Sequence, residues 1–407
     1  MALLPVSDAL KRLLDGAEAL APETVPLSEA AGRVLAAPLQ ALRTQPPFDA
    51  SAMDGYAVRA SDAVEGARLR VIGMAAAGHG FAGEVGTGEA VRIFTGAPLP
   101  KGADAIVIQE DTRPAGDGVV EVTETATVGR HIRRRGLDFS EGDTLLPAGR
   151  VLDAAALSLC ASANHPRLSV VSRPLVAIIA TGDELLPPGS TPGPDQIIAS
   201  NGYGVAAIAA EAGARILDLG IVRDDSAAIS ERLRQAAEAG ADIVVSLGGA
   251  SVGEHDLMRA TLIANGVSLD FWKIAMRPGK PLMVGRRGAT RFIGLPGNPV
   301  ASLVCSHLFL KPLLAHLGGR PYRADIRDAF LAEPMAANDL REDYVRARLE
   351  WKDGRLMATP YRIQDSSMLR LLAAADALVI RPPHSPAAPA GTPCRVLMLR
   401  TPELAQA

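Results

Sequence analysis

Three segments, DIVVSLGGASVGEHD (242–256), WKIAMRPGKPLMVG (272–285) and FIGLPGNPVASL (292–303), decide the fold of this chain. Each segment contains a short apolar run that leads into, or out of, a polar loop rich in glycine or proline. In an open α/β sheet, loops at the strand ends form the binding crevice. The stretch therefore predicts an α/β domain whose ligand site lies at the ends of successive strands.

The loops of this stretch carry charges of both signs. Glu254 and Asp256 follow the first apolar run, RPGKP contains Arg277 and Lys280, and LPGNP contains Asn298. Carboxylates suit a divalent cation, whereas lysine and arginine bind oxyanions. We therefore expect an anionic, phosphate-bearing ligand together with a metal.

Length and composition limit the class of protein. A chain of 407 residues predicts two to four domains. The content of 48% hydrophobic and 21% charged residues is that of a globular protein. A net charge of −3 gives no reason to expect a nucleic-acid partner, since phosphate backbones are met by a basic excess.

Cysteines and apolar runs bear on the compartment. Cys160, Cys305 and Cys394 are widely separated and odd in number, which fits a reducing compartment and gives no zinc spacing. The first twenty residues have apolar positions at helical spacing and predict a mature amphipathic helix rather than a signal peptide. No run is expected to be long enough to span a bilayer, so we expect a soluble cytoplasmic protein.

The first half of the chain changes character twice. Residues 1–43 and 143–172 have helical composition, including VLDAAALSLCASA at 151–163, whereas 44–142 contain short alternating runs between glycine and proline clusters. This order predicts a discontinuous helical domain interrupted by a β-rich insertion domain.

The second half predicts two further domains. In 173–321, strands at 175–182, 215–222 and 242–249 alternate with helices at 203–213 and 226–239, as in parallel βαβ units, and a long apolar helix follows at 299–317. Residues 322–407 return to short alternating runs and predict a C-terminal β domain. The expected fold class is multi-domain α/β plus β.

Acidic residues follow all three strands of the βαβ domain. Glu184, Asp224 and Asp256 are expected to meet at one edge of the sheet and to hold Mg²⁺, which takes one or two carboxylates plus substrate phosphates. Asp225 and Asp256 also stand where helix N-caps are common. The glycine pairs beside the acids, which capping does not explain, favour a site.

The two proline-glycine loops predict an anion site. Arg277 and Lys280 supply charge, and a helix beginning at Pro299 would present its N-terminus. Asn298 is also a good N-cap, and a solvated basic loop is the alternative. The shared pattern of RPGKP and LPGNP favours the site.

The β insertion has a second group of polar residues. PPFDASAMDGYAVR (46–59) and RIFTGAPLPKGADAIV (92–107) place Asp49, Asp54 and Thr95 in loop-rich segments that could face a cleft shared with a neighbouring domain. A turn role is the alternative for both acids.

Together these segments resemble the molybdopterin molybdenumtransferases, the MoeA family related to the E domain of gephyrin. The resemblance covers almost the whole chain and rests on eight motifs in the expected order: SAMDGYAVR, IFTGAPLPKGADAIV, RRRGLDF, ATGDEL, SNGYG, GGASVGEHD, RPGKP and GLPGNPV. The family is identified by the set, because each motif alone is weak.

The resemblance implies molybdenum cofactor biosynthesis: insertion of molybdate into adenylyl-molybdopterin with Mg²⁺-dependent release of AMP. It also implies a homodimer, with a site between the βαβ domain of one subunit and the β insertion of the other. A molybdopterin adenylyltransferase is a possible further partner.

By the same resemblance, the catalytic residues are Asp54, Glu184, Asp224 and Asp256, and the last three bind the metal. The substrate-binding residues are Thr95, Asp138, Gly248, Gly249, Ser251, Lys273, Arg277, Lys280, Pro296 and Asn298.

The chain departs from the family pattern at three places, of which Ala250, where valine is common, is expected to be harmless. Arg277 stands where lysine is common, and QDSSML (364–369) is less glycine-rich than the usual QGSGML, which leaves the roles of Ser366 and Ser367 open. Two other functions are also compatible with the central domain. These are a molybdopterin adenylyltransferase, which would not need the other domains, and a non-catalytic molybdopterin-binding scaffold, which would not need the full acid set.

Overall fold

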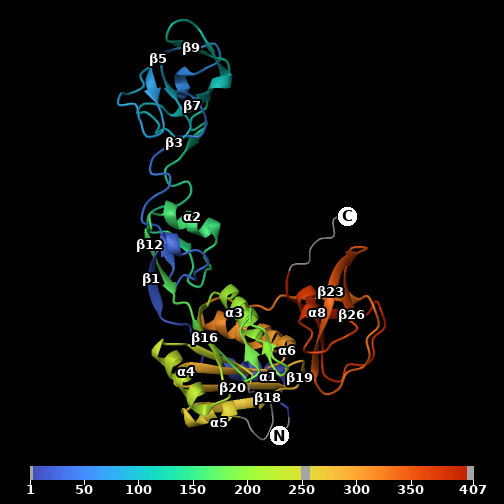
Figure 1. The fold of residues 1–407 in the computed structure, drawn as a ribbon. Helices are drawn as coiled ribbons and strands as arrows, with labels where there is room; N and C mark the ends of the chain where they lie inside the picture. Colours follow the sequence, from blue (N-terminus) through green and yellow to red (C-terminus); the bar gives the residue numbers. More distant parts are fainter. Residues whose placement is uncertain (1–2, 249–256, 401–407) are drawn as a thin grey trace. The chain divides into compact units, whose positions relative to one another are not determined.

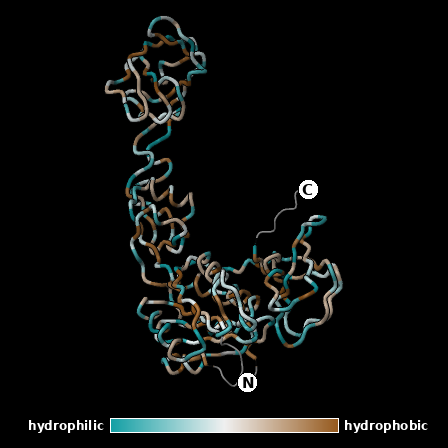
Figure 2. Tube along the Cα trace, viewed as in Figure 1, coloured by the Kyte–Doolittle hydropathy of each residue, from teal (hydrophilic) through white to brown (hydrophobic). Residues whose placement is uncertain are grey.

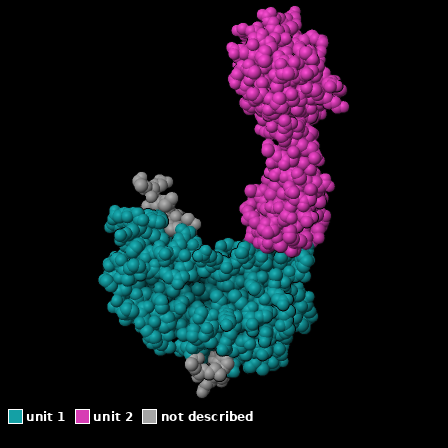
Figure 3. Space-filling view, turned by 180° about the vertical axis from the view of Figure 1, so that it is seen from behind, with its two compact units in different colours: residues 1–23, 32–34, 171–407 teal, residues 24–31, 35–170 magenta. Residues whose placement is uncertain are grey.

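The computed structural model describes residues 3–248 and 257–400. The chain divides into two compact units (Figures 1 and 3). Unit 1 consists of residues 1–23, 32–34 and 171–407, and unit 2 of residues 24–31 and 35–170. Hydrophobic and hydrophilic residues alternate in short stretches in both units (Figure 2).

Unit 1 is built around a mixed six-stranded sheet with the order β16-β13-β17-β21-β20-β18. The first four strands are parallel to one another, and β20 and β18 complete the sheet in antiparallel pairings. The bounds are β13 (Leu175–Thr181), β16 (Arg215–Val222), β17 (Ile243–Leu247), β18 (Ser268–Lys273), β20 (Pro281–Arg287) and β21 (Thr290–Leu295). The three strands predicted from the sequence are confirmed.

Helices cover both faces of this sheet. Successive strand residues point to opposite faces, so Val176 and Ile178 belong to one apolar cluster, and Ala177 and Ile179 to another. The first cluster is closed by α1 (Val6–Leu14), α3 (Asn201–Glu211), α6 (Pro299–Cys305), the π-helical turn η4 (Ser306–Leu310) and α7 (Lys311–Leu317). The second is closed by α4 (Ser226–Glu238) and α5 (Leu257–Ala264).

The segments α6, η4 and α7 form one apolar helix, Pro299–Leu317. Its 19 residues and mean hydropathy of 1.5 are sufficient by length and composition to cross a membrane, so the expectation that no run is long enough was wrong. The helix is 72% buried within the structure, with Phe309 and Leu313 fully inside the first apolar cluster. Length and hydropathy alone therefore do not distinguish this buried core helix from a membrane-spanning helix.

The C-terminal part of unit 1 is a closed β barrel. Its strands follow the order β23-β24-β22-β26-β25, and β25 pairs back onto β23. The short strand β19 (Met276–Arg277) pairs with the start of β23 and so joins the barrel to the central domain. The elements are β22 (Ile326–Leu331), β23 (Glu342–Lys352), β24 (Arg355–Pro360), α8 (Leu369–Ala374), β25 (Ala377–Arg381) and β26 (Pro393–Met398).

Unit 2 contains the β insertion. Its six-stranded sheet has the order β7-β4-β6-β5-β9-β8, and the pair β3–β10 lies apart from it. The bounds are β3 (Ala50–Ser51), β4 (Gly55–Val58), β5 (Arg68–Ala75), β6 (Glu89–Ile93), β7 (Ala105–Ile108), β8 (Thr112–Pro114), β9 (Val119–Val122) and β10 (Ile132–Arg133). Short 3-10 turns are η2 (Ala60–Asp62) and η3 (Gln109–Asp111).

The rest of unit 2 is only partly helical. Helix α2 (Ala154–Ser162) is capped by Asp153, which accepts a hydrogen bond from the amide of Ala156 at 2.9 Å. It packs with Val25, Ala30, Leu35 and Leu39 in one apolar cluster. The remaining elements are β1 (Pro22–Pro26), η1 (Leu27–Glu29), β2 (Leu39–Gln40), β11 (Thr144–Leu146) and β12 (Arg167–Val171).

The expectation that residues 1–43 are helical is confirmed only for α1. After α1 the chain forms strands and turns, because prolines bracket β1 and Gly32 has a φ of +68°. Helix α1 itself packs in unit 1, where Ala9 and Leu13 are completely buried. The apolar face of α1 therefore contributes to the core beneath the parallel sheet.

Replacing Phe309 tests the role of the long helix as core. Phe309→Ala is expected to lower the free energy of unfolding of unit 1 by about 3–5 kcal/mol, because it leaves a cavity in a fully buried cluster. Both tryptophans, Trp272 and Trp351, belong to unit 1, so fluorescence during urea unfolding reports on this unit. Ile263→Ala, at a half-exposed site on α5, is the control and should change little; equal losses in both variants would contradict the assignment.

Candidate functional site

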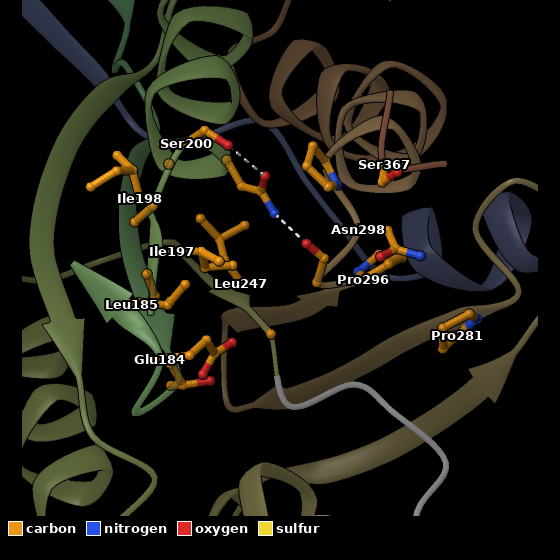
Figure 4. A pocket seen from close by; sticks show the side chains of 18 residues that line it. Glu184, Leu185, Ile197, Ile198, Ser200, Leu247, Pro281, Pro296, Asn298 and Ser367 are labelled. Atoms are coloured by element: carbon orange, nitrogen blue, oxygen red, sulfur yellow. Dashed lines mark hydrogen bonds between the residues drawn. The ribbon is translucent and has the colours of Figure 1, made fainter. Parts of the chain in front are cut away.

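A cavity of about 570 Å³ lies in unit 1 at the carboxyl ends of the parallel strands (Figure 4). In open α/β sheets this edge is the usual place for a ligand. The described residues that line it include Ala180, Thr181, Glu184, Leu185, Ile197, Ile198, Ser200, Asn201, Leu247, Gly248, Pro281, Pro296, Gly297, Asn298 and Ser367.

The cavity has one apolar wall and one polar wall. Figure 4 shows Leu185, Ile197 and Ile198 on one side, where the short strands β14 (Leu185–Leu186) and β15 (Ile197–Ile198) pair. Asn298 and Ser367 lie on the other side. A ligand with a flat apolar part and a charged part would find matching surroundings here.

The sheet reaches the cavity at Gly248 and Thr181. Gly248 has a φ of +94°, and a Cβ there would lie 2.6 Å from the carbonyl oxygen of Thr181, so only glycine fits. Thr181 is 4% exposed, and its Oγ1 has no hydrogen-bond partner among the described residues. A buried hydroxyl without a partner is costly unless a ligand supplies one.

Two predicted metal ligands lie close enough to influence one another. Asp224 reaches solvent, yet the surrounding chain removes part of its hydration, which raises its pKa, and the charges of Asp183 and Glu184 raise it further. Mutual repulsion of carboxylates is what a divalent cation relieves. The ion pair of Asp183 with Arg223, at 3.4 Å, is exposed and contributes little.

The donor set fits Mg²⁺ in part. Within residues 3–248 and 257–400, no three acidic, histidine or cysteine side chains cluster as a metal cage. Glu184 and Asp224 supply two hard oxygen donors, and Mg²⁺ commonly uses one or two carboxylates and completes its shell with phosphate and water. The predicted third ligand, Asp256, lies outside the described residues, as do Gly249 and Ser251.

Neighbouring acids have different roles at the start of α4. Asp225 caps the helix, with its Oδ1 accepting a hydrogen bond from the amide of Ala228 at 2.8 Å. Capping therefore explains Asp225, as the alternative interpretation held. It does not explain Asp224, which precedes the cap and lies near Glu184.

The barrel closes one end of the site. Asn298 makes no side-chain cap; its Nδ2 instead donates to Ser366 Oγ at 2.8 Å, and the amide of Val300 donates to the Ser366 carbonyl at 3.0 Å. The helix start that was expected to bind an anion is therefore partly occupied by the barrel loop. Ser367 lines the cavity beside it.

Asn201 also does not cap its helix. Its Nδ2 donates to the Gly297 carbonyl at 2.8 Å, and so links the start of α3 to the LPGNP loop.

The three predicted basic residues do not line the cavity in the described structure. Lys273 ends β18 opposite Pro281, and Lys280 is exposed beside it, so their loop reaches the cavity through Pro281. Arg277 donates a hydrogen bond to Asp343 of the barrel. This ion pair joins the RPGKP loop to the barrel, and its acidic partner, Asp343, is buried at 5% exposed.

Asp54 and Thr95 are brought together in unit 2. Asp54 Oδ1 accepts hydrogen bonds from the amide of Thr95 at 2.7 Å and from its hydroxyl at 2.8 Å. These bonds lower the pKa of Asp54, and the nearby charge of Arg92 adds to the effect. Asp138 is exposed in the same unit, and Asp49 is bonded to Arg134 at 2.7 Å.

Sequence reasoning missed several residues around the cavity. Thr181 stands inside the quoted motif ATGDEL, at the last position of β13, and that position was the available signal. The apolar wall of Leu185, Ile197 and Ile198 comes from a long loop whose two short strands have no distinctive pattern.

Three family descriptions match successive parts of the chain. The MoeA N-terminal region (domain I and II) matches residues 4–164, a probable molybdopterin binding domain matches 177–316, and the MoeA C-terminal region (domain IV) matches 328–399.

Curated relatives and solved structures agree with these matches. The chain is 38% identical over 345 residues to the molybdopterin molybdenumtransferase of Nostoc sp., covering 82% of this chain and 78% of that protein. It is 37% identical over 391 residues to molybdopterin molybdenumtransferase 2 of Mycobacterium tuberculosis, covering 92% and 94%. The molybdopterin biosynthesis MoeA protein of Pyrococcus horikoshii OT3 superposes with a TM-score of 0.80 at 27% identity, covering 98% of this chain and 100% of that one. The fold class expected from the sequence is thus confirmed, and the chain is an enzyme of molybdenum cofactor biosynthesis that belongs to the molybdopterin molybdenumtransferase (MoeA) family.

Proposed function

We propose that this enzyme inserts molybdate into adenylyl-molybdopterin and releases AMP in a Mg²⁺-dependent reaction. The observation that carries the proposal is the cavity at the strand ends, which combines an apolar wall with Glu184 at its margin and Asn298 and Ser367 opposite. A pterin is flat and largely apolar, whereas its pyrophosphate and the molybdate are anionic. The two walls suit these two parts.

The acids have a defined part in this proposal. Glu184 and Asp224 would hold Mg²⁺, with Asp256 as the third ligand. Bound there, Mg²⁺ would offset the negative charge of the pyrophosphate that is cleaved. Loss of hydration raises the pKa of Asp224 first, and the charges of Asp183 and Glu184 raise it further; a cation bound there would offset this repulsion, which supports the assignment.

The protein would act mainly by placement. Lys273, Arg277 and Lys280 would attract molybdate electrostatically, with Arg277 also fixed to the barrel through Asp343. Gly248, Gly249, Ser251, Pro296 and Asn298 would contact the substrate around the cavity. The dithiolene sulfurs of the substrate would displace molybdate oxygens, so a protein nucleophile is not needed.

Unit 2 would contribute from a second subunit. We propose a homodimer in which Asp54, Thr95 and Asp138 of one chain complete the site on unit 1 of the other. The bonded pair of Asp54 and Thr95 supports a polar contact surface on the β insertion. A cytoplasmic location follows from the same assignment, and an adenylyltransferase partner would supply the substrate.

AMP release is the direct test of the proposed reaction. Purified protein with adenylyl-molybdopterin and Mg²⁺ should release AMP when molybdate is added and should yield metal-loaded cofactor. Tight pterin binding without AMP release would indicate the scaffold instead. Formation of the adenylylated species from ATP would indicate the adenylyltransferase.

A neighbouring pair of acids gives a matched test of the metal site. Asp224→Asn should raise the Mg²⁺ concentration for half-maximal AMP release by at least about tenfold, because metal sites are sensitive to loss of a ligand charge. Asp225→Asn removes the same charge one residue away and retains a capping side chain, so it should leave the Mg²⁺ dependence unchanged. Equal effects of both substitutions would show a general charge effect and contradict the ligand assignment.

Thr181→Val tests whether the unpartnered hydroxyl meets the substrate. The free energy of unfolding should stay the same or rise, because no hydrogen bond to a described residue is lost. The KM for adenylyl-molybdopterin should rise about fivefold, the equivalent of one hydrogen bond of about 1 kcal/mol.

Thr261 is the control for this substitution. It is equally buried, but its hydroxyl bonds Ser226 Oγ at 3.1 Å. Thr261→Val should therefore lower stability and leave KM unchanged. An unchanged KM in Thr181→Val would remove Thr181 from the substrate contacts.

A further inference from the structure

Arg92 occupies an unusual position on the β insertion, beside the pair formed by Asp54 and Thr95. It lies on β6 directly opposite Tyr56 of β4. Its guanidinium carbon is 5.0 Å from the centroid of the Tyr56 ring and 5.1 Å from that of Phe94. Two aromatic contacts of this kind hold a guanidinium in a fixed place.

The hydrogen bonds of Arg92 support the backbone at and directly after Asp54. Nη1 donates to the Gly55 carbonyl at 3.4 Å, and Nη2 donates to Gln109 Oε1 at 2.7 Å. The backbone amide of Gln109 in turn donates to the Asp54 carbonyl at 3.1 Å. Arg92 therefore binds Gly55, which follows Asp54, and Gln109, which is hydrogen-bonded to the Asp54 carbonyl.

Asp54 stands directly before β4, whose first residue packs closely against β7. A Cβ on Gly55 would lie 2.0 Å from the Val107 carbonyl oxygen, so this position accepts only glycine and offers no side chain to pack. Asp54 itself is exposed. The strand pairing of β4 with β6 and β7 and the contacts of Arg92 thus set where the carboxylate stands.

One carboxylate oxygen is used internally. Both bonds from Thr95 fall on Oδ1, and among the described residues no hydrogen bond is made to Oδ2. Arg92 also lies close enough for its charge to help keep the pKa of Asp54 low. Asp54 is thereby held ionised, with one oxygen directed by Thr95 and the other available to a ligand.

We propose that Arg92 is a positioning residue for Asp54. Its guanidinium, in contact with the Tyr56 and Phe94 rings, fixes the backbone at the carbonyls of Asp54 and Gly55, the first through Gln109, so that the carboxylate keeps its two bonds to Thr95. The inference rests on the proposed function, in which Asp54 completes the site. Arg92 acts through Asp54 and does not itself contact the substrate.

Hydrogen exchange tests the geometry without requiring turnover. The backbone amide of Thr95 donates to Asp54, so in full-length Arg92→Met its exchange should be at least about tenfold faster than in the unsubstituted protein. Arg70→Met is the control, because Arg70 lies on the same sheet and bonds Glu89 instead. It should leave the Thr95 exchange unchanged, and unchanged exchange in Arg92→Met would overturn the proposal.

A double-mutant cycle tests the functional part. Arg92→Met should lower kcat/KM for AMP release about tenfold, the scale expected from a misplaced catalytic-site group. In the Asp54→Asn background the same substitution should change kcat/KM less than twofold, because the residue through which Arg92 acts is already altered. An equal loss in both backgrounds would show direct contact with the substrate or general unfolding, and would overturn the proposal.

Different results would contradict the proposed function and the positioning role of Arg92. No AMP release by the unsubstituted protein, or full activity in Asp54→Asn, would contradict the proposed function. A protein that turns over, is impaired by Asp54→Asn and is unaffected by Arg92→Met would contradict only the role of Arg92.

Discussion

The requirement to bury both faces of the parallel strands underlies the organisation of unit 1. Strands β13, β17 and β21 pair side by side, and their alternate residues fill two separate apolar clusters. Parallel strands need helical crossovers, which cover both faces and leave only the strand ends open to polar groups. The cavity, the acids after β13 and β16, and the LPGNP loop therefore share one edge of the sheet.

The barrel adds what the α/β domain lacks. It is joined through β19, through the ion pair of Arg277 with Asp343, and through the bonds of Ser366 to Asn298 and Val300. These contacts occupy part of the helix start and place Ser367 on the cavity. The barrel thus forms part of the wall of the cavity. The central domain alone would lack this part of the wall.

In both units a glycine allows close approach of two backbone segments. In unit 1 glycine at 248 lets β17 approach Thr181, and in unit 2 glycine at 55 lets β4 approach Val107. Each glycine stands beside a polar group that would meet a ligand, Thr181 in one case and Asp54 in the other. Close backbone packing of this kind fixes a side chain more firmly than a loop could.

The sequence by itself determined the parallel strands, the helices between them, the polar residues at their ends and the family. These features depend on local periodicity and on ordered motifs, so Glu184, Pro296 and Asn298 were predicted at the cavity they line. Tertiary structure alone decided that α1 belongs to the core of unit 1, that Ser366 bonds Asn298, and that Thr181 is buried without a partner among the described residues. The same holds for the contacts of Arg92 around Asp54. Each of these depends on residues far apart in the chain, whose meeting is set by packing and strand order and leaves no local pattern.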